Sequence, residues 1–165
     1  MRRALLAATI VIAGCGDGLD PQEEAQRAAR EVAKVEEVNR GPVMPITPEP
    51  ILYPDIEKHD LFGTNCAFVA EGGGLGAVAL TRQEDGYMKL DGKIVRFSAD
   101  SGSAELPFGT HRRYDGKKFA FELQLADEEG RQSGSEAMNY NGRLTVRDPR
   151  GNAVYDKTGE VQCGS

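Results

Sequence analysis

The sequence predicts an all-β protein, a single small antiparallel β-barrel or sandwich of about eight strands at residues 63–165. An N-terminal helix and a proline-rich tether precede it. Three observations lead to this fold class. After residue 66, short segments rich in β-branched and aromatic residues alternate between polar and apolar positions. Tight-turn dipeptides separate these segments, and no pattern of helical period lies between them.

The chain begins with two arginines, an apolar run at 4–13 and small residues before a cysteine, in the order MRRALLAATIVIAGC. Such a start is typical of an export signal, and the run is too short for a bilayer span of about 20 residues. The ending Ile12-Ala13-Gly14-Cys15 resembles the lipobox of bacterial lipoproteins, where signal peptidase II cuts. An ordinary secretory signal and an uncleaved anchor helix are the alternatives, but the first needs no cysteine here and the second needs a longer run.

The resemblance implies that residues 1–14 are a signal peptide and that Cys15 is the lipidated N-terminus of the mature chain. Two or three acyl chains together hold a protein firmly to a membrane. Glycine rather than aspartate follows the cysteine, and the sorting rule of this class then favours the outer membrane. We therefore expect a cell-envelope protein on the periplasmic face of the outer membrane.

The charge balance of the chain is acidic. The sequence holds 20 Lys and Arg against 26 Asp and Glu. Without Arg2 and Arg3, 18 basic residues remain against 26 acidic ones, a net charge of −8. This balance argues against a nucleic-acid partner and against electrostatic docking on anionic lipid.

Residues 15–38 are expected to carry the lipid and a spacer helix. Asp20 suits the N-cap, Pro21 the first helical position and Glu23 the third. One narrow stripe of small residues follows, made of Ala25, Ala28, Ala29, Val32, Val35 and Val38. A weak coiled coil or docking helix is the alternative to a solvated spacer, which we favour because the stripe buries little area.

Residues 39–62 are expected to form a tether. Residues 39–54 contain five prolines and favour extended polyproline geometry, which reaches about 50 Å at ~3.1 Å per residue. A proline-rich recognition ligand is the alternative. Residues 54–61 fit a short helical turn that leads into the β-domain.

The expected strands and turns follow from Cys66 onward. Asp91-Gly92 and Asn141-Gly142 suit type I′ hairpin turns, and Asp115-Gly116 and 148–151 supply further turns. The expected strands are CAFVA, AVALT, YMKL, KIVRFS, SAELPF, FAFELQL, GRLTVRD, AVYD and EVQC.

Cys66 and Cys163 are the cysteines that remain after the lipobox. An even pair in an oxidising compartment predicts a disulfide. This bond would join the first strand of the β-domain to the last.

The sequence offers no catalytic constellation. The glycine-rich segment 71–76 lacks the Lys-Ser/Thr of a P-loop and a helix after it, so a turn is favoured. No G-x-S-x-G elbow is present, and His59 and His111 are too few for a metal site. We therefore expect no metal, no cofactor and no enzyme activity. A hydrolase of cell-wall or lipid material is an alternative that needs converging carboxylates or His111.

One basic cluster stands out in this acidic chain, and it is the candidate binding loop for an anionic or sugar ligand. Its members are Thr110, His111, Arg112, Arg113, Tyr114, Lys117 and Lys118. The alternative is a solvated hairpin whose tyrosine packs inward.

Three segments are similar to the central strands of the membrane-bound inhibitors of C-type lysozyme. They are Leu90-Asp91-Gly92-Lys93, Arg113-Tyr114-Asp115-Gly116 and Phe119 to Leu123. The resemblance covers residues 66–163 and implies a periplasmic β-barrel lipoprotein with bridged early and late cysteines. Thr110-His111 stand where that family has Ser-Gly, and its downstream Lys-Gly motif is absent.

The leading hypothesis is thus a non-catalytic envelope lipoprotein, held to the membrane through Cys15, whose β-domain binds or spaces an envelope partner. A lysozyme-inhibitor-like protein acting through residues 110–118 is the alternative, with lysozyme as its partner.

Overall fold

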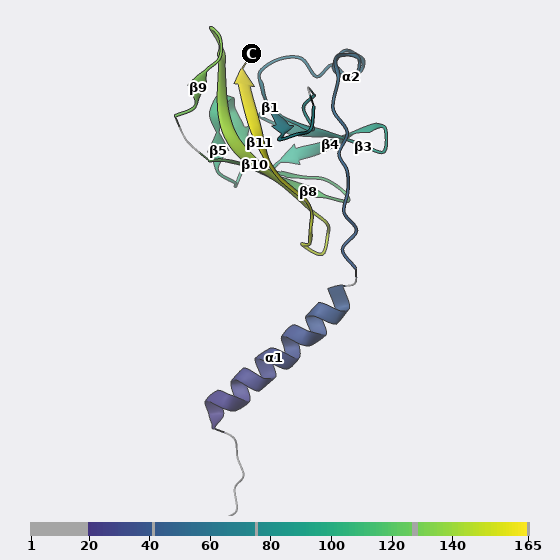
Figure 1. Cartoon of the computed structure of the whole chain (residues 1–165), viewed down its shortest axis with the longest axis vertical. Coiled ribbons are helices and arrows are strands. Elements are labelled where there is room, and N and C mark those ends of the chain that lie inside the picture. The colour runs from purple at the N-terminus through teal and green to yellow at the C-terminus, as the bar shows by residue number, and fades with distance from the viewer. Residues whose placement is uncertain (1–19, 41, 75, 127–128, 165) are drawn as a thin grey trace, which may run out of the picture. The chain divides into compact units, whose positions relative to one another are not determined.

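The computed structural model describes residues 20–40, 42–74, 76–126 and 129–164, so Cys15 and the signal segment lie outside the described residues. The chain divides into two units, residues 1–41 and 42–165 (Figure 1). Among the described residues, no helix is both long enough and apolar enough to cross a membrane.

The first unit contains helix α1 (Pro21–Arg40). Asp20 caps it, because its Oδ1 accepts a hydrogen bond from Gln22 N at 3.1 Å. Val32, Val35 and Val38 on the apolar stripe are 57, 60 and 75% exposed. Within its own unit, the stripe therefore gains little burial, and the spacer role stays a prediction.

The second unit is mostly β, and the predicted fold class is confirmed. Eight of the described strands close an antiparallel barrel in the order β11-β1-β2-β3-β4-β7-β8-β10, with β10 pairing back to β11. Strand β9 pairs with the first residues of β10, and β5 pairs with β6 in a separate two-stranded sheet. The bounds are β1 (Asn65–Ala70), β2 (Ala79–Thr81), β3 (Asp85–Leu90), β4 (Lys93–Ala99), β5 (Glu105–Leu106), β6 (Thr110–His111), β7 (Arg113–Asp115), β8 (Ala120–Leu125), β9 (Arg131–Gln132), β10 (Ala137–Arg147) and β11 (Ala153–Gly164).

Side chains fill the interior of the barrel. Alternate residues of each strand point inward, as in β1, where Cys66, Phe68 and Ala70 are buried. Aromatic rings occupy the centre: Phe121 stacks on Tyr114 at 5.0 Å and meets Phe97 edge-on at 4.9 Å.

The turns of the barrel confirm one sequence prediction and correct another. Asp91 and Gly92 have φ of 50° and 72°, as a type I′ turn between β3 and β4 requires. Asn141-Gly142 was expected to form the same turn, but this prediction is wrong because both residues lie inside β10. Gly142 pairs with Gly159 of β11, and a Cβ on Gly142 would lie 2.6 Å from Val161 Cγ2. Gly142 therefore allows close packing between strands of the barrel and does not form a chain-reversing turn.

The expected tether differs from the structure over most of its length. From Ile46 the chain runs along the barrel, where the amides of Ile46, Glu49 and Ile51 donate to Val154, Lys89 and Ala77. These donors are the non-proline residues between the prolines. Ile51 is 4% exposed and packs with Leu61 and Leu80. Apolar burial thus fixes a segment that composition alone assigned to solvent.

Helix α2 (Tyr53–His59) follows at the expected place. Asp55 accepts a hydrogen bond from Leu52 N and pairs with Lys89 Nζ of β3 at 3.0 Å. Ile56 packs against the cluster around Ile51 and Leu80, so α2 covers the outer side of β1 to β4. His59 is exposed.

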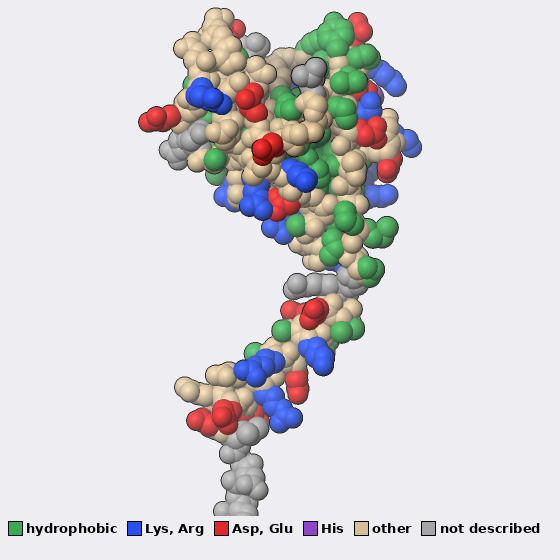
Figure 2. All heavy atoms as spheres, in the orientation of Figure 1, with side chains coloured by type: hydrophobic (Ala, Val, Ile, Leu, Met, Phe, Trp, Pro, Cys, Tyr) green, Lys and Arg blue, Asp and Glu red, His purple; other side chains and the backbone are tan. Residues whose placement is uncertain are grey.

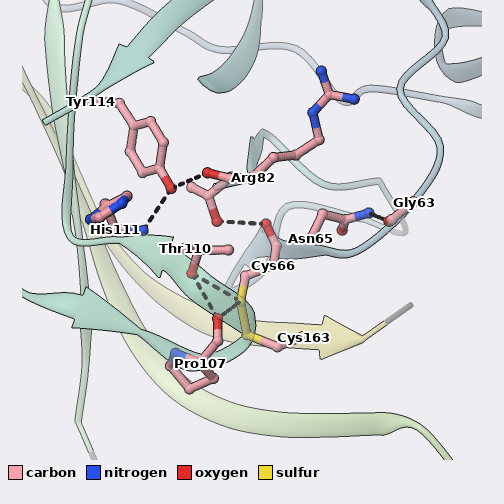
Figure 3. Close-up of a disulfide and its surroundings, with 10 residues drawn as sticks. Gly63, Asn65, Cys66, Arg82, Pro107, Thr110, His111, Tyr114 and Cys163 are labelled. Atoms are coloured by element: carbon pink, nitrogen blue, oxygen red, sulfur yellow. Dashed lines mark hydrogen bonds between the residues drawn. A yellow bond between two sulfur atoms is a disulfide. The ribbon is translucent and has the colours of Figure 1, made fainter. Parts of the chain in front are cut away.

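Cys66 of β1 and Cys163 of β11 are joined by a disulfide, as predicted (Figure 3). The two residues are direct cross-strand partners, and their Cα atoms lie 4.0 Å apart. Both side chains are buried. Thr110 Oγ1 donates to Pro107 O beside them at 3.0 Å, which holds the turn Pro107–Gly109 over the bond.

Candidate functional site

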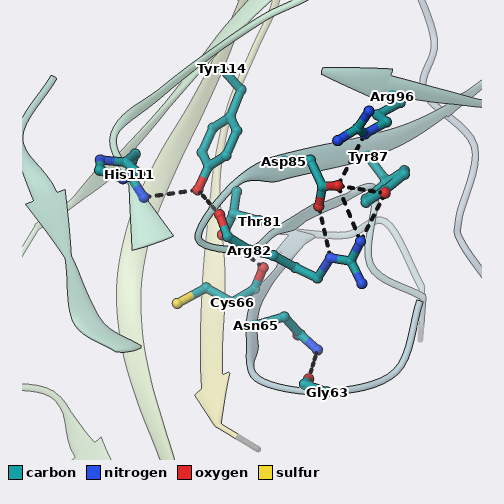
Figure 4. A network of polar contacts seen from close by, with 10 residues as sticks. All are labelled: Gly63, Asn65, Cys66, Thr81, Arg82, Asp85, Tyr87, Arg96, His111 and Tyr114. Carbon is teal, nitrogen blue, oxygen red and sulfur yellow. Dashed lines mark hydrogen bonds and ion pairs between the residues drawn. The ribbon is translucent and has the colours of Figure 1, made fainter. Parts of the chain in front are cut away.

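The residues of the candidate binding loop 110–118 lie in three different environments. Thr110 is buried beside the disulfide, and Tyr114 is buried in the core of the barrel. The Tyr114 hydroxyl accepts a hydrogen bond from His111 N at 2.8 Å and donates to Arg82 O at 2.7 Å (Figure 4). Burial raises the pKa of Tyr114. These contacts join β6, β7 and the β2–β3 connection, so Tyr114 acts inside the fold.

Arg112 and Arg113 lie on the wall of the barrel next to carboxylates. Arg113 Nη2 pairs with Asp115 at 2.8 Å, and this hydrogen bond raises the pKa of the guanidinium. Arg112 lies 3.7 Å from Glu122. Both charges are balanced within the chain. Inhibition of lysozyme through the whole segment stays a prediction.

Lys117 and Lys118 occupy the β7–β8 turn and are exposed. Next to them, hollows of about 320, 510 and 750 Å³ meet at Lys118 and Phe119. We call this surface the turn-end groove, because the β3–β4, β7–β8 and β10–β11 turns all border it. Its apolar walls are Met44, Ile46, Leu90, Val95, Phe97, Phe119 and Val154.

The charged rim of the groove is mainly basic. No carboxylate among the described residues pairs with Lys93, Lys117 or Lys118. Asp148 receives hydrogen bonds from Asn152 and from backbone amides, which lower its pKa and occupy its oxygens. Asp91 is the other carboxylate in the two larger hollows, and Asp115 and Glu122 of the smallest hollow pair with Arg113. Figure 2 shows Lys and Arg side chains gathered along the lower part of the β-domain. A ligand with negative charge and an apolar body fits this rim and these walls.

A saturated polar network lies on the outer face of β3 and β4 (Figure 4). Asp85 accepts hydrogen bonds from Arg82, Tyr87 and Arg96 at 2.8 to 3.2 Å. Burial alone would raise the pKa of Asp85, but these donors outweigh it and the pKa lies below its usual value. Because its partners occupy the carboxylate, we interpret the network as structural.

A fourth hollow of about 330 Å³ lies at the opposite end of the barrel, between Phe62 and Phe108. Both rings are exposed, and Phe108 has a φ of 60°, which is rare for a bulky residue. Arg82 and Asp85 of the polar network form part of its lining. Since the charges of Arg82 and Asp85 are already paired, this hollow offers a ligand fewer free charged groups than the turn-end groove does.

Within the described part of the chain, no three His, Cys, Asp or Glu side chains come together as a metal site. His111 does not line the turn-end groove, and its Nδ1 is buried without a hydrogen bond to another described residue.

Comparisons with protein-family models, curated proteins and solved structures find no match. The functional assignment therefore depends on the sequence and on the geometry of the groove.

Proposed function

We propose that this protein is an envelope lipoprotein whose β-barrel binds an anionic partner in the periplasm through the turn-end groove. The observation that carries the binding role is the set of three unpaired lysines around apolar walls, in a chain of net charge −6. The groups that the groove offers are ammonium and apolar side chains, which suit binding better than acid–base catalysis.

The lipobox at residues 12–15 supports the anchor. Residues 44–47, near the start of the second unit, line the groove. On this proposal, lipid on Cys15 holds the protein at the periplasmic face of the outer membrane. The predicted export also explains how an oxidising compartment allows the Cys66–Cys163 bond.

Replacement of the lipobox cysteine tests the anchor. We expect the wild-type chain to incorporate labelled palmitate and to sediment with membranes, whereas Cys15→Ala should lose the label and leave the membrane fraction. Thr9→Ala, which changes the apolar run but leaves residues 12–15 intact, serves as the matched control and should behave as wild type. A wild-type chain without lipid label, or a Cys15→Ala chain that keeps it, would overturn the proposed anchor.

A further inference from the structure

Strand β4 has an open edge. It pairs with β3 along Lys93 to Ser98, but with β7 only through Ser98 and Ala99. Residues 93–97 therefore have no strand on their second side among the described residues. A closed barrel normally satisfies both sides of every strand, so this stretch is a gap in the wall.

The hydrogen-bond pattern shows which backbone groups face the gap. Ala99 N donates to Glu84 on the β3 side, whereas Asp100 N donates to Arg113 on the β7 side, both at 2.9 Å. Backbone N–H and C=O groups of successive strand residues point to opposite sides. In β4, those of odd-numbered residues therefore point toward β3 and those of even-numbered residues point away from it. The N–H and C=O groups of Ile94 and Arg96 therefore point into the gap.

Three lysines of the groove's rim lie beside this edge. A hollow of about 510 Å³ adjoins it, with Val95, Phe97 and Phe119 among its walls and Lys93, Lys117 and Lys118 around it. The β7–β8 turn stays close to the barrel here, since a Cβ on Gly116 would lie 2.8 Å from the ring of Phe97. Strand β7 thus ends before it can cover β4.

We infer that the turn-end groove takes an extended acidic segment of a partner protein, which adds as a strand to the edge of β4. This inference rests on the proposed function and names its partner class. The open N–H and C=O groups match an extended backbone, the lysines match carboxylates, and the apolar walls match every second side chain of a strand. Residues 93–97 give room for about 16 Å of strand at ~3.3 Å per residue.

Other occupants fit less well. A small anion would use the lysines and leave the backbone groups of Ile94 and Arg96 without partners. A second copy of β4 would bring a second set of Lys93, Lys117 and Lys118 to the same gap, and like charges oppose such pairing.

The test uses the ¹⁵N-labelled full chain in detergent and the synthetic peptide Ac-Glu-Val-Asp-Val-Glu-Val-Glu-NH₂. In the free protein the amides of Ile94 and Arg96 should exchange with solvent faster than those of Val95 and Phe97, which bond to β3. Saturating peptide should slow exchange at Ile94 and Arg96 at least about tenfold, because each amide gains a hydrogen bond.

Two N-methylated peptides distinguish the contribution of backbone hydrogen bonds to binding from that of charge. One carries N-methyl groups at odd residues and the other at even residues, so only one of them blocks the side that faces β4. We expect that peptide to bind about tenfold more weakly than the other, the loss expected for two or three hydrogen bonds. Lys117→Gln/Lys118→Gln should weaken the parent peptide about tenfold, while the matched control Lys58→Gln/Lys157→Gln, outside the groove, should not.

The outcomes distinguish the inference from the proposed function. The peptide could bind in a lysine-dependent manner without slowing amide exchange at Ile94 and Arg96, or both methylated peptides could lose the same affinity. Either result would overturn strand addition and leave the groove as a binding site. Lysine-dependent binding of inorganic phosphate or of anionic phospholipid vesicles in place of the peptide would overturn the partner class alone. If none of the three probes binds in a lysine-dependent manner, both the inference and the binding role are wrong.

Discussion

Removal of the disulfide should lower the stability of the β-domain strongly. Cys66 and Cys163 lie 97 residues apart in the sequence, so the bond closes a loop that holds nearly the whole barrel. The chain-entropy model gives about 4.7 kcal/mol at 25 °C for a loop of this length. With a denaturant dependence of about 2 kcal/mol per molar urea, the unfolding midpoint should fall by about 2.4 M.

The assay is urea unfolding followed by circular dichroism for three samples: oxidised wild type, reduced wild type and Cys66→Ala/Cys163→Ala. Reduction removes only the cross-link, whereas the double variant also removes two buried sulfur atoms, so the variant should be the least stable. A fall of less than about 0.5 M on reduction would refute the entropic reasoning, because it corresponds to about 1 kcal/mol. Alkylation of both cysteines in the oxidised protein would refute the bond itself.

Two further predictions concern the network on β3 and a glycine in β10. Asp85→Asn should cost about 2 kcal/mol at pH 7, because hydrogen bonds to a charged group are lost. The native pKa of Asp85 is lowered, so its contribution is complete above about pH 4 and disappears as the pH falls through the native value. Urea midpoints of wild type and variant should therefore converge in acid, and parallel pH curves would contradict this reasoning. Gly142→Ala should cost about 1 to 3 kcal/mol in thermal unfolding because its Cβ meets Val161, whereas Gly134→Ala, whose Cβ would lie 3.9 Å from Ala137, should stay near wild type. Equal losses in both variants would show that close packing is not the cause.

The fold could be predicted because its strongest signals are local. Alternation and the Asp91-Gly92 turn each depend on a few neighbouring residues, and the disulfide follows from the single pair of cysteines after Cys15. Asn141-Gly142 has the same local signal as Asp91-Gly92, but the need for a side-chain-free position opposite Gly159 depends on barrel closure. Local sequence holds no information on that closure. The same limit applies to the tether, since Ile51 is buried by packing against Leu61 and Leu80, which lie far from it in the sequence or on another element.

The candidate site could be predicted only in part. The basic cluster was visible in the sequence, and Lys117 and Lys118 do border a groove. Thr110 and Tyr114 do not, because both side chains are buried, Thr110 beside the disulfide and Tyr114 in the core of the barrel. Sequence reasoning missed Lys93 and Val95 as neighbours of these lysines, since they come from β4, which meets the β7–β8 turn only in the folded barrel.

The two seams of the barrel differ in a way that bears on the partner. Along one seam, β10 pairs with β11 over eleven residue pairs, and the disulfide ties β11 to β1 next to it. Along the other, β4 meets β7 over two pairs. An open edge invites pairing with other chains, and lysines at such an edge are a common protection against self-association. Lys93, Lys117 and Lys118 repel a second copy of this edge, but they attract a strand that carries carboxylates. On the strand-addition proposal, the same three charges would oppose pairing of two copies and favour an acidic segment as the strand that closes the gap.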